Sequence, residues 1–212
     1  MQSEPAPTQP RLTLSDRFRK WFKWFLDPIA AALNRAGVHP NTVSIFGFLG
    51  TVVGAYLVAI GQIRWGGLVI LLMAPVDAID GSMARQRGVK SRFGAFVDSV
   101  TDRYSELVVY FGFLIYYTGI GDRPMSLVVF LAAAGSLLVS YIRARAEAVS
   151  FDARGGLLSR LERYLILCPS MILGIAWIGL AIIALLANIT ALQRIYAVRR
   201  QAAGTPGAEH VH

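Results

Sequence analysis

The chain has 212 residues, of which 55% are hydrophobic and only 16% are charged, and its mean hydropathy is +0.50. This composition excludes an ordinary soluble domain and favours one all-α membrane domain, because several spanning helices of about 20 residues each would use nearly the whole length. A single cysteine, Cys168, excludes an internal disulfide.

The ends of the chain differ in character from its middle. Residues 1–13 are rich in proline and polar residues, which predicts a disordered lead, and residues 201–212 predict a disordered tail. Residues 14–37 predict an amphipathic helix on the membrane surface, which the same apolar stripe would also allow to pack on the rest of the protein. The stripe consists of Leu14, Phe18, Trp21, Phe22, Phe25, Ile29 and Leu33.

Six apolar segments follow within residues 41–198, and we expect each to form a transmembrane helix. Their expected ranges are 41–60, 65–85, 94–118, 125–148, 158–175 and 179–198. The last two are divided near Trp177 and Gly179, because one helix over the whole stretch would be about twice as long as a bilayer is thick. In the first segment, Gly50 and Gly54 are spaced for close helix contact, either within one chain or between two.

The basic residues are distributed very unevenly along these segments. Of 21 Lys and Arg residues, only Arg64 and Arg123 fall in the connections on one side. Positively charged loops stay in the cytoplasm, so both termini are predicted to be cytoplasmic in a multi-pass protein of the cell (inner) membrane. Topology and contact with anionic membrane lipids account for the net charge of +8, so nucleic acid is not an expected partner.

Four aspartates lie near the cytoplasmic ends of the second and third segments: Asp77 and Asp80, then Asp98 and Asp102. Each pair shares a helix face, and all four converge if the two helices are antiparallel neighbours. Carboxylates clustered in this way need cations, and oxygen ligands without His or Cys favour Mg²⁺ or Mn²⁺, with two ions about 4 Å apart able to clamp a phosphate. The alternative is that ion pairs with nearby arginines neutralise them, from Arg85, Arg87, Arg92 and Arg103.

The acidic segment also matches a known pattern, D-x2-D-G-x2-A-R-x8-G-x3-D-x3-D, and so resembles the CDP-alcohol phosphotransferase family. The resemblance implies a homodimeric membrane enzyme that transfers the phosphatidyl group of CDP-diacylglycerol to an alcohol and releases CMP. It further implies that the four aspartates hold the metal ions and that Asp102 is the general base. The residues expected to contact the nucleotide are Asp77, Asp80, Gly81, Ala84, Arg85 and Gly94.

A second group of residues bears on the acceptor alcohol: Arg143 and Arg145 near the end of the fourth segment, and Arg160 and Arg163 at the start of the fifth. Guanidinium groups bind phosphate bidentately, so these arginines predict a pocket for a phosphorylated acceptor. Their surroundings, "SYIRARAEA" and "GLLSRLERYLI", resemble the prokaryotic phosphatidylinositol phosphate synthase branch, whose acceptor is inositol 1-phosphate. Ser159 departs from that branch, where an acid is common.

Two alternatives remain open at this level. Glycerol 3-phosphate also carries a phosphate, which would make the protein a phosphatidylglycerophosphate synthase. A cation transporter could line its pathway with the same four acids. The transporter alternative leaves Gly81, Ala84, Arg85 and Gly94 without an explanation for their fixed spacing.

Overall fold

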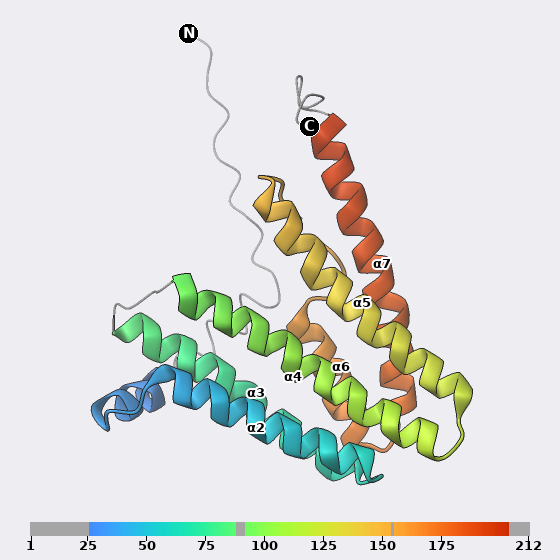
Figure 1. The fold of residues 1–212 in the computed structure, drawn as a ribbon, viewed down its shortest axis with the longest axis horizontal. Helices are drawn as coiled ribbons and strands as arrows, with labels where there is room; N and C mark the ends of the chain where they lie inside the picture. Colours follow the sequence, from blue (N-terminus) through green and yellow to red (C-terminus); the bar gives the residue numbers. More distant parts are fainter. Residues whose placement is uncertain (1–25, 88–91, 154, 204–212) are drawn as a thin grey trace.

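The computed structural model describes residues 26–87, 92–153 and 155–203, apart from the side chains of Asp77 and Arg92. Regular structure in these residues is helical throughout (Figure 1), which confirms the all-α prediction. The predicted lead, residues 14–25 of the predicted surface helix and residues 204–212 of the predicted tail lie outside the described residues.

The helices follow the predicted segments closely. Residues 26–35 are helical, and the elements after them are α2 (Pro40–Ala59), α3 (Ile63–Gln86), α4 (Arg92–Gly119), α5 (Arg123–Ala148), α6 (Arg160–Ile172) and α7 (Ala176–Ala203). The break between the last two helices lies at residues 173–175, a few residues before the division predicted near Trp177 and Gly179. The helix α7 also continues to Ala203, past the predicted start of the tail.

Local chemistry explains the short length of α6. At its start, Ser159 and Glu162 form a capping box, in which each side chain accepts a hydrogen bond from the other residue's backbone N–H. At its end, Gly174 has a φ of 79°, a left-handed conformation that costs glycine little, and its N–H donates to Met171 O at 3.1 Å. The helix therefore has 13 residues and is about 20 Å long.

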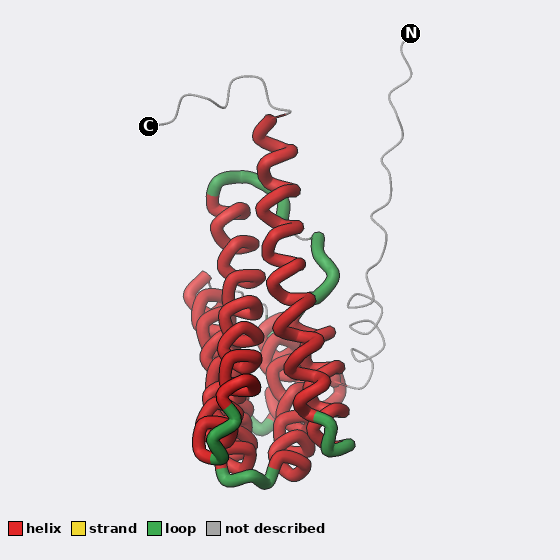
Figure 2. Tube along the Cα trace, turned by 90° about the vertical axis from the view of Figure 1, so that its right-hand side faces the viewer, coloured by secondary structure: helices red, strands yellow, loops and turns green. Residues whose placement is uncertain are grey.

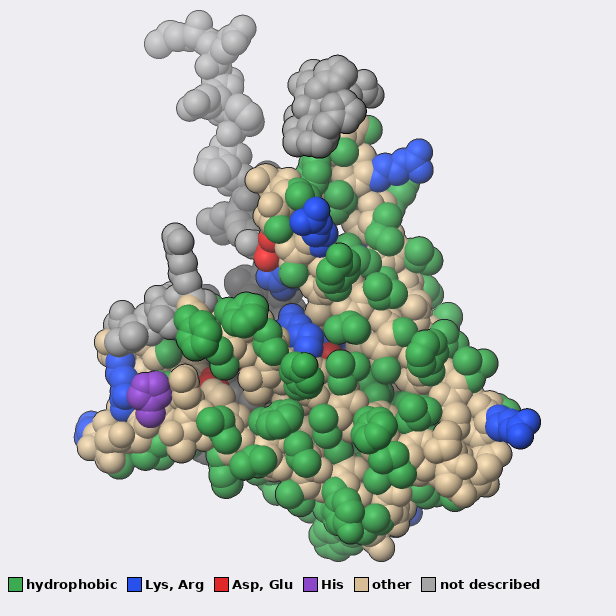
Figure 3. Space-filling model, viewed as in Figure 1, with side chains coloured by type: hydrophobic (Ala, Val, Ile, Leu, Met, Phe, Trp, Pro, Cys, Tyr) green, Lys and Arg blue, Asp and Glu red, His purple; other side chains and the backbone are tan. Residues whose placement is uncertain are grey.

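Much of the surface is suited to lipid. In the described part of the chain, the helices α2, α3, α5 and α7 are long and apolar enough to cross a membrane. Phe46, Phe111 and Phe130 are among the many exposed large hydrophobic side chains. Hydrophobic side chains spread over the face seen in Figure 3, whereas Lys and Arg are sparse on its lower half. An exterior of this kind is stable next to hydrocarbon and unfavourable in water. The structure thus supports a membrane-integral protein.

The helices α2 to α7 pack as a closed ring. The helix α2 packs on both α3 and α4, α4 packs on α5, α5 on α7, α7 on α6, and α6 on α3. The interior is filled by buried side chains that include Phe113, Met171 and Ile183. The α2–α3, α4–α5 and α6–α7 turns lie at one end, called here the turn end (Figures 1 and 2). The opposite ends of α3 and α4, which carry the aspartates, form the carboxylate end.

This ring bears on the condition set for α3 and α4, that the four aspartates converge if the two helices are antiparallel neighbours. The extensive contacts of both helices are with α2, which packs on each of them. Small residues make the α2–α3 contact close: a Cβ added to Gly54 would lie 2.6 Å from Ile70 Cγ1, and one added to Gly66 would lie 2.7 Å from Gly54 O. The α2 glycines, Gly50 and Gly54, therefore serve packing within the chain.

Candidate active site

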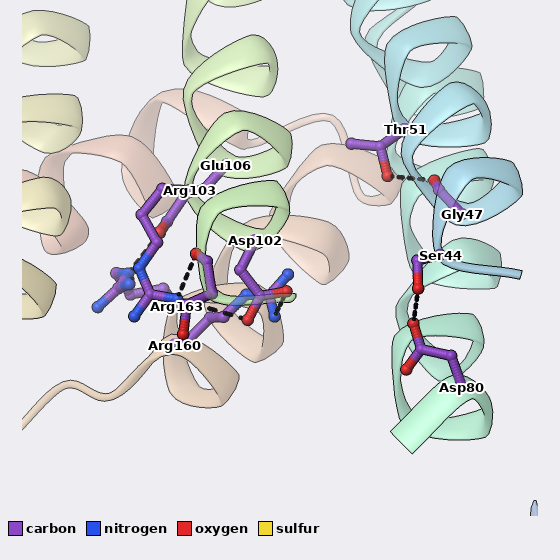
Figure 4. A network of polar contacts seen from close by, with 10 residues as sticks. Ser44, Gly47, Thr51, Asp80, Asp102, Arg103, Glu106, Arg160 and Arg163 are labelled. Atoms are coloured by element: carbon purple, nitrogen blue, oxygen red, sulfur yellow. Dashed lines mark hydrogen bonds and ion pairs between the residues drawn. The ribbon is translucent and has the colours of Figure 1, made fainter. Parts of the chain in front are cut away.

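The carboxylates of α3 and α4 lie in two surroundings. Asp80 is buried on α3 and accepts a hydrogen bond from the Ser44 hydroxyl of α2. Asp98 is exposed on α4, and Asp102 follows one turn later with a side chain 17% exposed. Figure 4 shows Asp80 and Asp102 apart from one another, with Asp102 near the middle of the view and Asp80 at its lower right.

Metal binding by these aspartates stays a prediction. Among the described side chains, no group of three or more His, Cys, Asp and Glu residues lies close enough to hold a metal ion, and the side chain of Asp77 is not one of those described. The donor chemistry fits a hard divalent cation, because every candidate ligand is a carboxylate oxygen. The aspartates also lie at the carboxylate end of the bundle, where an ion could enter from water.

Asp102 connects the acidic segment to the predicted acceptor arginines. Its Oδ1 lies 2.5 Å from Arg160 Nη1 of α6, and its Oδ2 lies 3.5 Å from Arg103 Nη1. Ion pairing with a neighbouring arginine was the alternative to metal binding, and Arg103 provides such a contact. The Arg160 guanidinium also lies 5.5 Å from the centre of the Tyr164 ring, a cation–π distance that helps to orient it.

A second ion pair joins α4 to α6 one turn deeper, and it contains a residue that we did not predict, Glu106. Its partner Arg163 is only 2% exposed; Arg163 Nε lies 2.5 Å from Glu106 Oε1 and Arg163 Nη2 lies 2.9 Å from Glu106 Oε2 (Figure 4). The remaining nitrogen, Nη1, donates to Leu158 O at 3.4 Å. All three nitrogens of the Arg163 guanidinium donate to these groups. Its contacts are therefore those of a residue that holds α6 on α4, and they favour this role over direct contact with an acceptor phosphate.

The other basic residues near this end differ in exposure. Arg143 and Arg145 are exposed on α5, and Arg143 Nε lies 3.0 Å from Glu147 Oε1. Arg194 of α7, which was also not predicted, is 5% exposed and donates to Gly155 O at 2.9 Å and to Val139 O at 2.5 Å. Both of its acceptors are backbone carbonyls, so the charge of Arg194 adds to the positive potential of this region.

The predicted nucleotide-contacting residues lie on the last turns of α3 and the first turn of α4. Gly81 is next to Arg85, since a Cβ at Gly81 would lie 3.5 Å from Arg85 Nη1. Ala84 is on the same turn of α3, and Gly94 is on α4. Gly81 and Ala84 thus leave little side-chain bulk within one turn of the exposed guanidinium of Arg85.

Contacts with the helical residues 26–35 fix this end of α3. The Ser82 hydroxyl donates to Asp27 Oδ1 at 2.5 Å, and Asn34 Nδ2 donates to Met83 O at 3.3 Å. Leu33 packs in the same small apolar cluster as Met83. The described part of the N-terminal helix is thus packed on the protein, as its apolar stripe allowed.

Comparison with known proteins places these features in a family context. A family model described as CDP-alcohol phosphatidyltransferase matches residues 37–200. The chain is 38% identical to the phosphatidylinositol phosphate synthase of Mycobacteroides abscessus over 90% of this chain and 89% of that protein. It is 36% identical to the synthase of the same name from Streptomyces avermitilis, over 96% of this chain and 89% of that protein.

Solved structures show the same similarity. The phosphatidylinositol phosphate synthase (PgsA1) of Mycobacterium tuberculosis with CDP-DAG bound superimposes with a TM-score of 0.79 at 32% identity, covering 88% of this chain and 98% of that one. A structure of that synthase in complex with manganese and citrate also gives a TM-score of 0.79. It covers 88% of this chain and 93% of the other.

Proposed function

This chain belongs to the CDP-alcohol phosphatidyltransferase family, and from that premise we propose that it transfers the phosphatidyl group of CDP-diacylglycerol to inositol 1-phosphate. The products are phosphatidylinositol phosphate and CMP. The observation that carries the proposal is the contact between Asp102 and Arg160, because it joins the acidic motif of α4 to the arginines of the predicted acceptor pocket.

The reaction is a displacement at the phosphorus that carries the lipid. The acceptor hydroxyl oxygen forms a bond to this phosphorus, the bond from phosphorus to the bridging oxygen of CMP breaks, and CMP leaves with that oxygen. The hydroxyl proton passes to a base, for which we propose Asp102. Two divalent cations, Mg²⁺ or Mn²⁺, held by Asp77, Asp80, Asp98 and Asp102, would neutralise the diphosphate and stabilise the leaving phosphate.

The ion pair with Arg160 gives acceptor binding a direct effect on the base. A carboxylate held by a guanidinium is a weaker proton acceptor than one released from it. An incoming phosphate competes for Arg160, since phosphate forms strong charge-assisted hydrogen bonds with arginine. We propose that Arg160, together with Arg143 and Arg145, binds the acceptor phosphate and thereby releases Asp102 from its ion pair. Arg163 would keep α6 packed on α4 through its ion pair with Glu106.

The remaining features of the proposal concern the donor and the setting. Asp77, Asp80, Gly81, Ala84, Arg85 and Gly94 would contact the nucleotide of CDP-diacylglycerol. The chain would cross the membrane six times, with the helix of residues 14–37 on the surface and both termini and the active site in the cytoplasm. We also propose a homodimer, on the strength of the family resemblance.

Release of CMP by the purified protein tests the function. The assay contains CDP-diacylglycerol, Mg²⁺ and, in separate reactions, inositol 1-phosphate, glycerol 3-phosphate, serine or free inositol. We expect release with inositol 1-phosphate, loss of release on chelation with EDTA, and recovery when Mg²⁺ or Mn²⁺ is returned. Release with glycerol 3-phosphate alone would reassign the protein as a phosphatidylglycerophosphate synthase, and the absence of release with every acceptor would contradict the proposed reaction.

A further inference from the structure

A pocket of about 400 Å³ opens at the turn end of the bundle, away from the aspartates. Its walls come from the start of α3, the end of α4 and the α6–α7 turn. Arg64 lines this pocket, and Asp80 lies on the same helix about 24 Å farther along the axis. The pocket is therefore separate from the proposed active site, and a ligand bound in it need not take part in the proposed reaction.

Two glycine turns bring a guanidinium and an aromatic ring against the backbone of this pocket. A Cβ at Gly174 would lie 2.9 Å from Arg64 Nη2 and 3.2 Å from Arg64 Nε, so the guanidinium lies directly over the α6–α7 turn. A Cβ at Gly61 would lie 3.3 Å from Tyr116 Cε2, so the ring lies over the α2–α3 turn in the same way. Both glycines have positive φ, which makes a side chain at either position unfavourable.

The charge of the pocket is positive. Among the described residues that line it, only Arg64 is charged. The first residues of α3 and α7, Ile63 and Ala176, also line it, so the positive ends of two long helices add to the potential. The carboxylate of Asp122 lies at the same end but accepts a hydrogen bond from Met125 N at 3.0 Å and does not line the pocket.

The rim of the pocket is apolar and aromatic. Trp65 and Trp177 are 62% and 56% exposed, and each lies in the first turn of a helix able to span a membrane. Tryptophan concentrates at this depth, where the head groups meet the hydrocarbon. Ile60 and Leu173, in the adjoining turns, are also exposed. A cationic pocket with such a rim suits a phosphate attached to hydrocarbon better than a phosphate free in water.

We propose that this pocket binds the phosphate of an anionic phospholipid head group from the leaflet at the turn end. Arg64 is the phosphate ligand, and Tyr116, Trp65 and Trp177 surround the head group and the start of its acyl chains. A volume of about 400 Å³ accommodates a head group while the acyl chains remain in the bilayer.

Lipid titration of the full-length protein tests this site. Phosphatidylglycerol and phosphatidylcholine are added to the detergent-solubilised protein, and the apparent Kd of each is measured by native mass spectrometry. We expect phosphatidylglycerol to bind at least tenfold more tightly than phosphatidylcholine, and we expect Arg64→Gln to remove this preference. Arg64→Lys, which keeps the charge without the planar fork, should retain part of it. Arg64 is exposed, so these variants should fold.

Arg123→Gln is the matched control, because Arg123 lies at the same end without lining the pocket. It should bind both lipids as the unchanged protein does, and Arg64→Gln should leave CMP release unchanged. Equal affinity for the two lipids, or equal loss in the Arg64 and Arg123 variants, would overturn the proposal. Binding of inorganic phosphate at the same site with the affinity of phosphatidylglycerol would show a simple anion site and would also overturn it.

Discussion

The Glu106–Arg163 pair illustrates how single residues fix the packing of helices at the carboxylate end. Both partners are buried, and each loses the water that would otherwise solvate its charge. The bidentate contact compensates for that loss only while both charges are present. The pair therefore matters most as a condition for correct packing of α6 on α4.

Removing one partner of the Glu106–Arg163 pair should lower the stability of the protein. Glu106→Gln leaves the Arg163 charge buried without its carboxylate, so we expect the free energy of unfolding to fall by about 3–5 kcal/mol. The double variant Glu106→Gln/Arg163→Met removes both charges and should recover much of this loss. The measurement is thermal unfolding in detergent, followed by circular dichroism. A Glu106→Gln protein as stable as the parent would show that the pair is not structural.

The Asp102–Arg160 contact leads to a kinetic prediction. Arg160→Gln should raise the KM for the phosphorylated acceptor by about tenfold or more, because a charged hydrogen bond to phosphate is lost. Asp102→Asn should instead lower kcat by about 10²–10⁴-fold, as expected for loss of a general base. CMP release at varied acceptor concentrations separates the two effects, with Arg200→Gln, exposed at the far end of α7, as the control. An unchanged acceptor KM in Arg160→Gln would count against the pocket.

At the residue scale, the sequence predicts the motif but not its partners. Asp98, Asp102 and the arginines of α6 follow from spacing and from the resemblance. Glu106 continues the same spacing of four along α4 and could have been found from that signal. Its pairing with Arg163 depends on which helices face each other across the ring, and local periodicity does not contain this information. Arg194 was missed for the same reason.

At the scale of elements, close helix contacts depend on glycine. Gly112 of α4 faces α2, where an added Cβ would be pressed against Ala55 O and would lie 3.1 Å from Ala55 C. Backbone atoms cannot rotate out of the way as a side chain can. The two helices would have to separate to admit even one methyl group.

This contact can be tested by adding a methyl group. Gly112→Ala should lower the stability by about 1–3 kcal/mol, the usual cost of overpacking, despite the higher helix propensity of alanine. Gly119→Ala is the matched control on the same helix, because a Cβ there has nothing within 4 Å. Thermal unfolding of the two variants gives the comparison. Equal stabilities would mean that α2 and α4 can move apart at little cost.

Element boundaries show where sequence patterns lose precision. The starts of α2 and α5 are marked by Pro40 and Pro124, so their predicted ranges are close to those observed. The apolar stretch around residues 158–198 has no such signal at the break, and Gly174 stands among residues that are hydrophobic on both sides. Its left-handed turn ends α6 early, and apolarity alone did not predict that turn.

At the scale of the whole molecule, the ring of helices has two chemically different ends. The carboxylate end holds the four motif aspartates, Glu106 and most of the described arginines, whereas the turn end has Arg64, Asp122 and Arg123. This asymmetry was predictable from the uneven distribution of Lys and Arg along the sequence. The order of helices around the ring was not, since several orders would bury the same apolar faces.

Cysteine labelling tests the orientation of the two ends. In a Cys168→Ala background, Arg123→Cys should react with a membrane-impermeant maleimide added outside intact cells, whereas Ala203→Cys should react only after lysis. Cys168 is buried, so its removal is needed chiefly to exclude labelling of partly unfolded protein. The opposite labelling pattern would invert the proposed topology.

The brevity of α6 bears on how two immiscible reactants can meet. At about 20 Å it is shorter than the roughly 30 Å hydrocarbon layer, so its capped first turn begins below the level at which the longer helices leave the membrane. We therefore expect water and head groups to dip toward Arg160 on that side. A sugar phosphate dissolved in the water on that side would then reach a nucleotide-activated lipid without the lipid leaving the bilayer or the sugar entering the hydrocarbon layer.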